Sequence, residues 1–106
     1  MVDFCLSEEQ TALRDRARKF AEEEIAPRAR EYDASGAYPF DIMKKAFELG
    51  LMNDNIPKQY GGPGHSCFEL ALVTEELGVG CMGITTCIMA NALALTPLIL
   101  FGNEEQ

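Results

Sequence analysis

The stretch GITTCIMANALALTPLILFG, from Gly83 to Gly102, decides how the whole sequence is interpreted, because no charged residue occurs between Glu76 and Glu104. So long an uncharged segment fits a membrane span, a helix buried inside a protein, or the wall of a pocket for an apolar ligand. A span needs roughly 20 apolar residues, but threonines, an asparagine and a proline interrupt this segment, and no flanking Lys or Arg anchors it. We therefore expect a buried helix from about Gly83 to Leu95, not a membrane-spanning one.

The second half of the stretch predicts a break. Thr96 before Pro97 is typical of an N-cap followed by a first helical turn, and Gly102 is a typical stop. We expect a separate short helix between Thr96 and Gly102. Asn103 with Gln106 is a further helix-start pattern, which suggests a chain cut short before its next helix. The helix predicted from Gly83 to Leu95 has more apolar surface than a small domain can cover, which agrees with that expectation.

The first third of the chain predicts a long, interrupted helix. Ser7 and Gln10 form a capping box at its start. Pro27 lacks an N–H and predicts a kink, after which the helix continues to about Gly36. The apolar stripe of this helix consists of Leu13, Ala17, Phe20, Ala21 and Ile25.

Two further helices flank a loop that holds two prolines and three glycines. The first begins near Pro39 and stops at Gly50. The second begins at the capping box of Ser66 and Glu69 and runs to Gly78. Their predicted apolar stripes are Phe40, Met43, Phe47 and Leu51 in the first, and Phe68, Leu70, Leu72, Val73 and Leu77 in the second. Residues 1–106 thus predict one all-α domain.

Composition excludes several classes of partner. A net charge of −8, with Lys and Arg scattered among acids, lacks the basic footprint of a nucleic-acid or anionic-membrane binder. Hydrophobic residues make up 47% of the chain and charged residues 25%, as in ordinary globular proteins. Cys5, Cys67, Cys81 and Cys87 show no metal-binding spacing, so we expect buried thiols in a reducing compartment and no metal site.

Candidate catalytic groups are few. His65 has no plausible Ser, Cys or Asp partner at a known spacing, and a loop histidine is the simplest interpretation. The glycines of Tyr60–Gly64 precede Ser66, where backbone N–H groups suit a phosphate, although a purely turn-forming role fits better. The acidic runs Glu22–Glu24 and Glu75–Glu76 are expected on solvated faces, because adjacent helical residues diverge.

Small and weakly polar residues share one side of the Gly83–Leu95 helix. Thr85, Met89 and Ala92 fall on one face, and Thr86, Met89, Ala90 and Leu93 on an overlapping one. Such a stripe fits a protein core or a pocket. Composition and periodicity therefore predict a buried helical bundle without catalytic machinery.

Five segments spread over the chain carry a further indication. They are LSEEQ (Leu6–Gln10), ARKFAEEEIAPRAREYDASGAYP (Ala17–Pro39), FELGLMNDNIPKQYGGPG (Phe47–Gly64), TEELGVGCMGITT (Thr74–Thr86) and LILFGNEEQ (Leu98–Gln106). In this order and spacing the sequence resembles the N-terminal helical domain of the acyl-CoA dehydrogenases, most closely the medium-chain type.

The resemblance implies a longer three-domain α/β/α protein, a homotetramer of the mitochondrial matrix that binds FAD. In that family a glutamate removes the α-proton of a fatty acyl-CoA while the β-hydrogen passes to the flavin as hydride. The product is a trans-2-enoyl-CoA, and electron-transfer flavoprotein accepts the electrons. The glutamate and nearly all flavin contacts lie beyond Gln106 by family pattern, so no catalytic, cofactor-binding or metal-binding residue is expected in this chain.

The resemblance also gives the apolar helix a role as part of the wall around the acyl tail. The positions that match the family's tail pocket are Thr85, Thr86, Met89, Ala90 and Leu93. Medium-chain relatives tend to have a glutamate where this chain has Met89, which leaves the chain-length preference open. A flavin oxidase on the same fold is a close alternative, and a stand-alone helical module that binds a lipid or a protein is a more distant one.

Overall fold

The structure, a computed structural model, describes residues 3–106 and consists of helices and loops within that range. The five α-helices are α1 (Glu8–Phe20), α2 (Ala29–Ser35), α3 (Phe40–Glu48), α4 (Cys67–Gly80) and α5 (Met82–Phe101). Three short helical turns are η1 (Ala21–Ile25), η2 (Ala26–Arg28) and η3 (Lys58–Tyr60). The predicted all-α class is confirmed.

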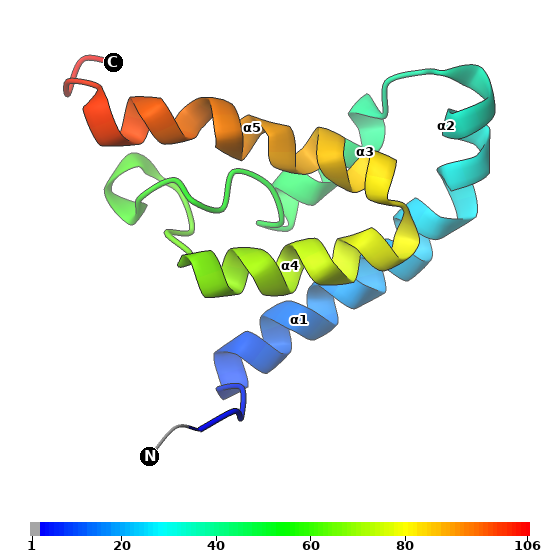
Figure 1. Cartoon of the computed structure of the whole chain (residues 1–106), viewed down its shortest axis with the longest axis horizontal. Helices are drawn as coiled ribbons and strands as arrows, with labels where there is room; N and C mark the ends of the chain where they lie inside the picture. Colours follow the sequence, from blue (N-terminus) through cyan, green and yellow to red (C-terminus); the bar gives the residue numbers. More distant parts are fainter. Residues whose placement is uncertain (1–2) are drawn as a thin grey trace.

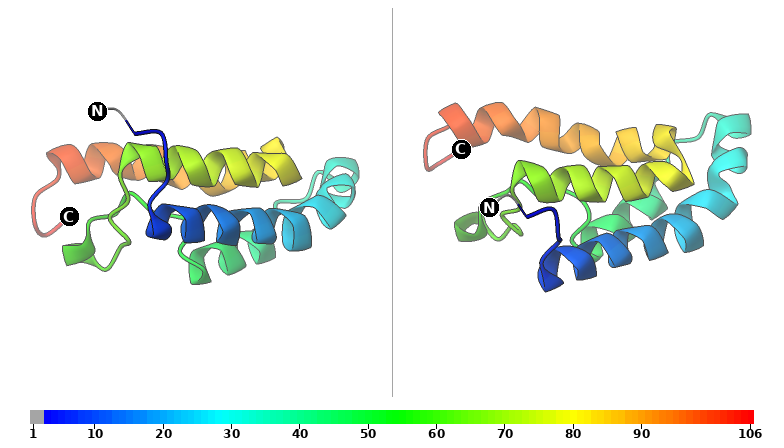
Figure 2. Two further views of the ribbon diagram at one scale, coloured as in Figure 1. Left: turned by 90° about the horizontal axis from the view of Figure 1, so that it is seen from below. Right: turned by 60° about the horizontal axis from the view of Figure 1, so that its bottom comes forward.

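The helices form a flat molecule with extents of 40 × 40 × 20 Å. Helix α4 lies beside both α1 and α5, and α3 packs behind α5 (Figure 1). The α2 turn projects at the end away from both termini in every view (Figure 2). The core between the helices contains the large, fully buried side chains of Ile25, Ile42, Leu51, Leu77 and Ile88.

Helix α1 begins at the predicted capping box. The Gln10 N–H donates to Ser7 Oγ at 3.1 Å, and the Ser7 N–H donates to Gln10 Oε1 at 3.0 Å. All five predicted stripe residues are buried. The kink predicted at Pro27 is present as a π-helical turn, η1, followed by a 3₁₀ turn, η2. The continuation α2 ends at Gly36, whose φ of 65° is the left-handed C-cap that glycine favours.

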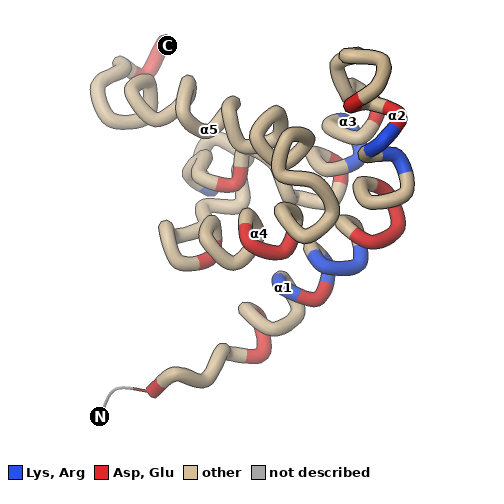
Figure 3. The backbone as a smooth tube through the Cα atoms, turned by 45° about the vertical axis from the view of Figure 1, so that its right-hand side comes forward, with Lys and Arg blue, Asp and Glu red and all other residues tan. Residues whose placement is uncertain are grey.

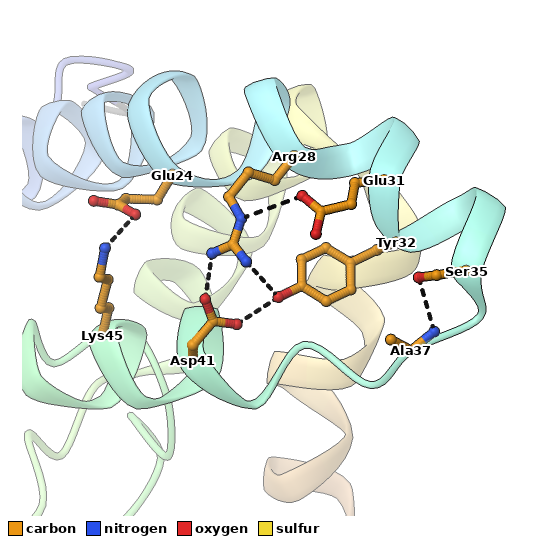
Figure 4. Close-up of polar contacts among 8 residues, drawn as sticks. All are labelled: Glu24, Arg28, Glu31, Tyr32, Ser35, Ala37, Asp41 and Lys45. Carbon is orange, nitrogen blue, oxygen red and sulfur yellow. Dashed lines mark hydrogen bonds and ion pairs between the residues drawn. The ribbon is translucent and has the colours of Figure 1, made fainter.

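A polar cluster joins η2 and α2 to the start of α3 (Figure 4). Arg28 forms an ion pair with Asp41 and donates from Nη2 to the Tyr32 hydroxyl at 2.7 Å. The Tyr32 hydroxyl in turn donates to Asp41. These hydrogen bonds from Tyr32 and Arg28 lower the pKa of Asp41 to about 2. The cluster therefore stabilises the turn between α2 and α3 while its carboxylate is ionised.

The predicted apolar face of α3 is only half correct. Met43 and Leu51 are buried, but Phe40 and Phe47 are 73% and 59% exposed. Ile42 and Ala46 are buried in the core together with Met43. The helix is therefore rotated by about one residue relative to the prediction.

Helix α4 begins at its predicted capping box but runs past Gly78 to Gly80. Its Glu76 is only 8% exposed and forms an ion pair with Arg18 of α1. The prediction of a solvated face is therefore wrong for Glu76, since a carboxylate at a helix interface needs a cationic partner. Glu75, the adjacent residue, is exposed as predicted.

Helix α5 continues without the break predicted at Thr96 and Pro97. Pro97 removes only one helical hydrogen bond, and neighbouring groups strengthen the turn. The Thr96 hydroxyl donates to the Ala92 carbonyl at 2.7 Å, and Asn55 Nδ2 donates to the same carbonyl at 3.3 Å. The helix stops at Gly102, as predicted.

Two smaller predictions concern the chain end and the thiols. Asn103 and Gln106 form the predicted reciprocal capping contacts, at 3.0 and 2.9 Å. The expectation of buried thiols is wrong: Cys5 and Cys67 are exposed, and Cys81 and Cys87 are partly exposed. All four are free cysteines.

Candidate functional site

Helix α5 carries the candidate site, because it is uncharged along its length and only one side of it is covered. Ile84, Thr85, Ile88 and Ala92 are its buried residues. By length and composition alone it could cross a membrane, and 22% of its most apolar 18-residue window is buried within this chain. Figure 3 shows the absence of charge on α5, whereas acidic and basic residues gather on α1, α2 and α3. The helix predicted to be buried is thus half uncovered here.

The structure separates the five residues predicted to line a pocket. Thr85 is fully buried, and its hydroxyl donates to the Cys81 carbonyl at 2.9 Å. Thr86 and Ala90 are exposed, and Leu93 is 77% exposed. Thr86, Met89, Ala90 and Leu93 follow the i, i+3, i+4, i+7 spacing of one helical face. We call these four residues the outer face of α5.

Met89 marks the boundary between the outer face and the core. Its side chain is partly buried and packs against the core cluster. Its sulfur lies 3.3 Å from the hydroxyl oxygen of Thr74 on α4, and that hydroxyl also donates to the Leu70 carbonyl at 2.8 Å. Sequence analysis did not identify Thr74, because the contact joins residues on different helices. It is the polar group that α4 places under the outer face.

The apolar surface continues toward the end of α5. Leu98, Ile99, Leu100 and Phe101 are all exposed, and Phe101 is 86% exposed. A cavity of about 300 Å³ lies between the C-terminal end of α5 and the loop that precedes α4. Its lining includes Ile56, Tyr60 and Leu98. Exposed apolar area of this extent is typical of a surface that another protein or a ligand covers.

A polar pair in the loop before α4 was not predicted. Asp54 is fully buried, and its Oδ2 lies 3.9 Å from Nδ1 of His65. Neither carboxylate oxygen has a hydrogen-bond partner, and burial raises the pKa of Asp54. The loop thus brings Asp54 near His65 without a hydrogen bond between them, and the two residues share no known catalytic motif.

The glycine-rich run before α4 forms turns. Gly61 and Gly64 have φ values of 85° and 66°, and a Cβ on Gly62 would lie 2.2 Å from the Ile56 carbonyl oxygen. The Glu69 carboxylate accepts the Ser66 N–H and hydroxyl, each at 2.7 Å, which lowers the pKa of Glu69. An acidic side chain already occupies this helix start, which disfavours the phosphate alternative.

The described residues do not fit a flavin dinucleotide. Its pyrophosphate needs free backbone N–H groups or a cluster of cations. Capping boxes close the starts of α1 and α4, and the starts of α3 and α5, which have no side-chain cap, have no basic residue in their first turn. A surface hollow of about 460 Å³ over α1 and α3 has cations, yet three acids, Glu23, Glu24 and Glu48, also line it. No group of three or more His, Cys, Asp or Glu residues suited to a metal ion occurs within residues 3–106.

The fold and the outer face define a helical domain with one uncovered apolar helix. Residues 7–106 match the acyl-CoA dehydrogenase, N-terminal domain. The chain therefore belongs to the acyl-CoA dehydrogenase family and corresponds to its N-terminal domain.

Curated relatives from animals and bacteria match 99% of the chain. It is 43% identical over 105 residues to a probable medium-chain specific acyl-CoA dehydrogenase 2, mitochondrial, of Caenorhabditis briggsae. It is 42% identical over 107 residues to a probable acyl-CoA dehydrogenase of Bacillus subtilis, and 35% identical over 105 residues to an acryloyl-CoA reductase (NADH) of Anaerotignum propionicum. The chain spans 26%, 28% and 27% of these relatives, respectively.

A solved structure has the same fold. A chain in the structure of the electron transferring flavoprotein of Acidaminococcus fermentans superposes with a TM-score of 0.89 and 34% identity. The match covers 98% of this chain and 28% of that one. Both kinds of comparison therefore support an oxidoreductase family in which flavin is used.

Proposed function

We propose that this chain is the N-terminal part of a flavin-dependent acyl-CoA dehydrogenase that oxidises a fatty acyl-CoA to a trans-2-enoyl-CoA in fatty-acid β-oxidation. The observation that carries the proposal is the outer face of α5, which carries no charge and whose Thr86, Ala90 and Leu93 are exposed. A hydrocarbon tail gains roughly 0.8 kcal/mol for each methylene that such a surface removes from water. The domain would therefore contribute binding energy for the acyl tail. Residues outside the domain would carry out the oxidation.

The proposed wall consists of Thr86, Met89, Ala90 and Leu93, with the buried Thr85 beside it on α5. The small side chains of Thr86 and Ala90 leave room above the helix, whereas Met89 and Leu93 supply flexible apolar contact. Thr85 contributes from inside the domain, because its buried hydroxyl bonds the Cys81 carbonyl and orients the first turn of α5.

The proposal includes a cofactor and partners that lie outside the described residues. FAD would be bound by other domains, electron-transfer flavoprotein would accept the electrons, and the whole protein would be a homotetramer that does not cross a membrane. The uncovered side of α5 would then be covered by protein and substrate. The nematode relative is named as mitochondrial, which supports the mitochondrial matrix as the location.

Purification of the protein encoded by the complete reading frame tests this function. It should be yellow and should bleach when a saturated fatty acyl-CoA is added without oxygen. Leu93→Asp should weaken bleaching by long chains more than by short ones, because a buried carboxylate beside hydrocarbon costs several kcal/mol. Phe47→Asp, at an exposed apolar position of α3, is the matched control. A colourless protein that is inert to every chain length would overturn the proposal.

The direction of the reaction needs its own measurement, because one relative is named as a reductase. Reoxidation of the bleached flavin by an electron-transferring flavoprotein but not by oxygen identifies a dehydrogenase. Rapid reoxidation by oxygen identifies an oxidase, and NADH-driven reduction of an enoyl-CoA identifies a reductase. The alternative of a stand-alone helical module that binds a lipid or a protein predicts a monomer that folds without flavin and binds through the same face of α5.

A further inference from the structure

We propose that Thr74 is a positioning residue, which holds the Met89 thioether against α4 and thereby sets the length of acyl chain that the outer face accepts. The inference rests on the proposed function, because it assigns a role to a residue behind the proposed wall. Thr74 itself lies on α4 and does not belong to the outer face. It acts only through Met89.

The Thr74 hydroxyl faces two acceptors. The Leu70 carbonyl, one turn earlier on α4, lies 2.8 Å from the hydroxyl oxygen, and Met89 Sδ on α5 lies 3.3 Å from it. A hydroxyl has one proton, so it donates to one of these acceptors at a time. When it donates to the sulfur, it forms the hydrogen bond that holds the thioether against α4. Valine keeps the shape of threonine but cannot form this hydrogen bond.

The Met89 side chain is flexible, so a contact that fixes its end group changes the shape of the outer face. Methionine has three rotatable bonds and adapts to irregular gaps, so its end group has no strong preference of its own. With the sulfur held toward α4, the side chain packs on the core, and the neighbouring Ala90 is exposed. Without the contact, the thioether is free to turn outward. It would then occupy the volume that the end of a long tail requires.

Thr74→Val tests this role, because valine keeps the branched shape and removes the hydroxyl. In the complete holoenzyme, we expect kcat/KM for the longest accepted acyl-CoA to fall about 10-fold, the lower end of discrimination for one methylene in an apolar pocket. The loss should appear in KM, since tail contacts bind substrate and transition state alike. Short acyl-CoAs should be unaffected. Thr74→Ser, which retains the hydroxyl, should keep the wild-type chain-length profile.

A double variant separates positioning from general damage. In a Met89→Leu background, Thr74→Val should have no further effect on chain length, because the thioether is absent. The ¹³Cε methyl resonance of Met89 gives a readout independent of activity: it should shift in Thr74→Val and remain in place in Thr74→Ser. Equal losses in Thr74→Val and Thr74→Ser, or the same loss in the Met89→Leu background, would overturn the proposal. A protein that no acyl-CoA bleaches would contradict the proposed function, whereas an unchanged methyl resonance would contradict the role of Thr74.

Discussion

Two glycines of α4 should respond in opposite ways to the same substitution. A Cβ added at Gly80 would lie 2.8 Å from the Ala21 carbonyl oxygen and 2.9 Å from Ile25 Cβ. The Ala21 carbonyl accepts the Ala26 N–H in the π-helical turn, so it cannot move without breaking that bond. A Cβ at Gly78 would meet only the end of the Met82 side chain, whose terminal methyl would lie at 2.8 Å.

The magnitudes follow from these contacts. Alanine is favoured over glycine inside a helix by up to about 1 kcal/mol, and this gain is smaller at Gly80, the last residue of α4. Overpacking against backbone costs roughly 1–3 kcal/mol. Gly80→Ala should therefore destabilise the protein by roughly 1–2 kcal/mol. Gly78→Ala should be neutral or stabilising by up to about 1 kcal/mol, because the flexible Met82 side chain can move aside.

Urea unfolding followed by far-ultraviolet circular dichroism measures both variants against the wild type. A difference of 1 kcal/mol moves the thermal midpoint of a domain of this size by roughly 4–8 °C, so thermal unfolding is a second readout. If Gly80→Ala unfolds at the same urea concentration as Gly78→Ala, the close approach of α4 to the π-helical turn does not constrain this position. The helix would then pack less tightly than the structure indicates.

Three further predictions concern charge and the proline. The folded-state pKa of Asp41 is lowered to about 2, chiefly by the Tyr32 hydroxyl; Asp41→Asn should therefore lower the unfolding midpoint at neutral pH, and this difference should fade as pH falls from about 4 to about 2. The pKa of Asp54 is raised by burial, so its ionisation destabilises the fold as pH rises; Asp54→Asn should be more stable than wild type at neutral pH, and a thermal midpoint below wild type there would contradict this reasoning. Pro97→Ala should restore an N–H donor to α5 and raise stability by up to about 3 kcal/mol, which chemical denaturation would measure.

The sequence was most informative where the signal was local. The capping boxes at Ser7 and Ser66 formed as predicted, because each requires two residues three positions apart and no tertiary contact. Pro27 likewise predicted an interruption, since its missing N–H acts within one turn. Pro97 was misjudged by the same rule, because Asn55 from a distant loop strengthens that turn. A local rule therefore failed where a tertiary contact intervened.

Contacts between distant segments could not be predicted. Glu76 is buried because Arg18, 58 positions earlier, forms an ion pair with it. Asp54 and His65 meet because the turns of one irregular loop bring them to 3.9 Å. In both cases the residue types are ordinary in the sequence, and only the tertiary fold gives them partners.

The candidate site illustrates the same limit within a single helix. Thr85 and Thr86 are adjacent and similar, so an α5 that is apolar all round gives no period from which to decide which of them faces the core. The packing of the neighbouring helices, α3 and α4, decides it: Thr85 is fully buried and Thr86 is exposed. The face of α5 that remains outside is therefore defined by the neighbouring helices.

The affinity and the selectivity of the outer face for a ligand depend on different features of α5. With no charge between Glu76 and Glu104, α5 offers a ligand no electrostatic steering and no buried ion pair, so affinity depends on apolar area and selectivity on shape. Shape on this face is fixed wherever a side chain is small, as at Ala90, and variable wherever it is long and flexible, as at Met89. Selectivity for a ligand must then depend on the contacts that restrict the Met89 side chain. In the described part of the chain, the polar group recorded in contact with the Met89 sulfur is the Thr74 hydroxyl, which places the control of shape on α4, beneath the binding surface.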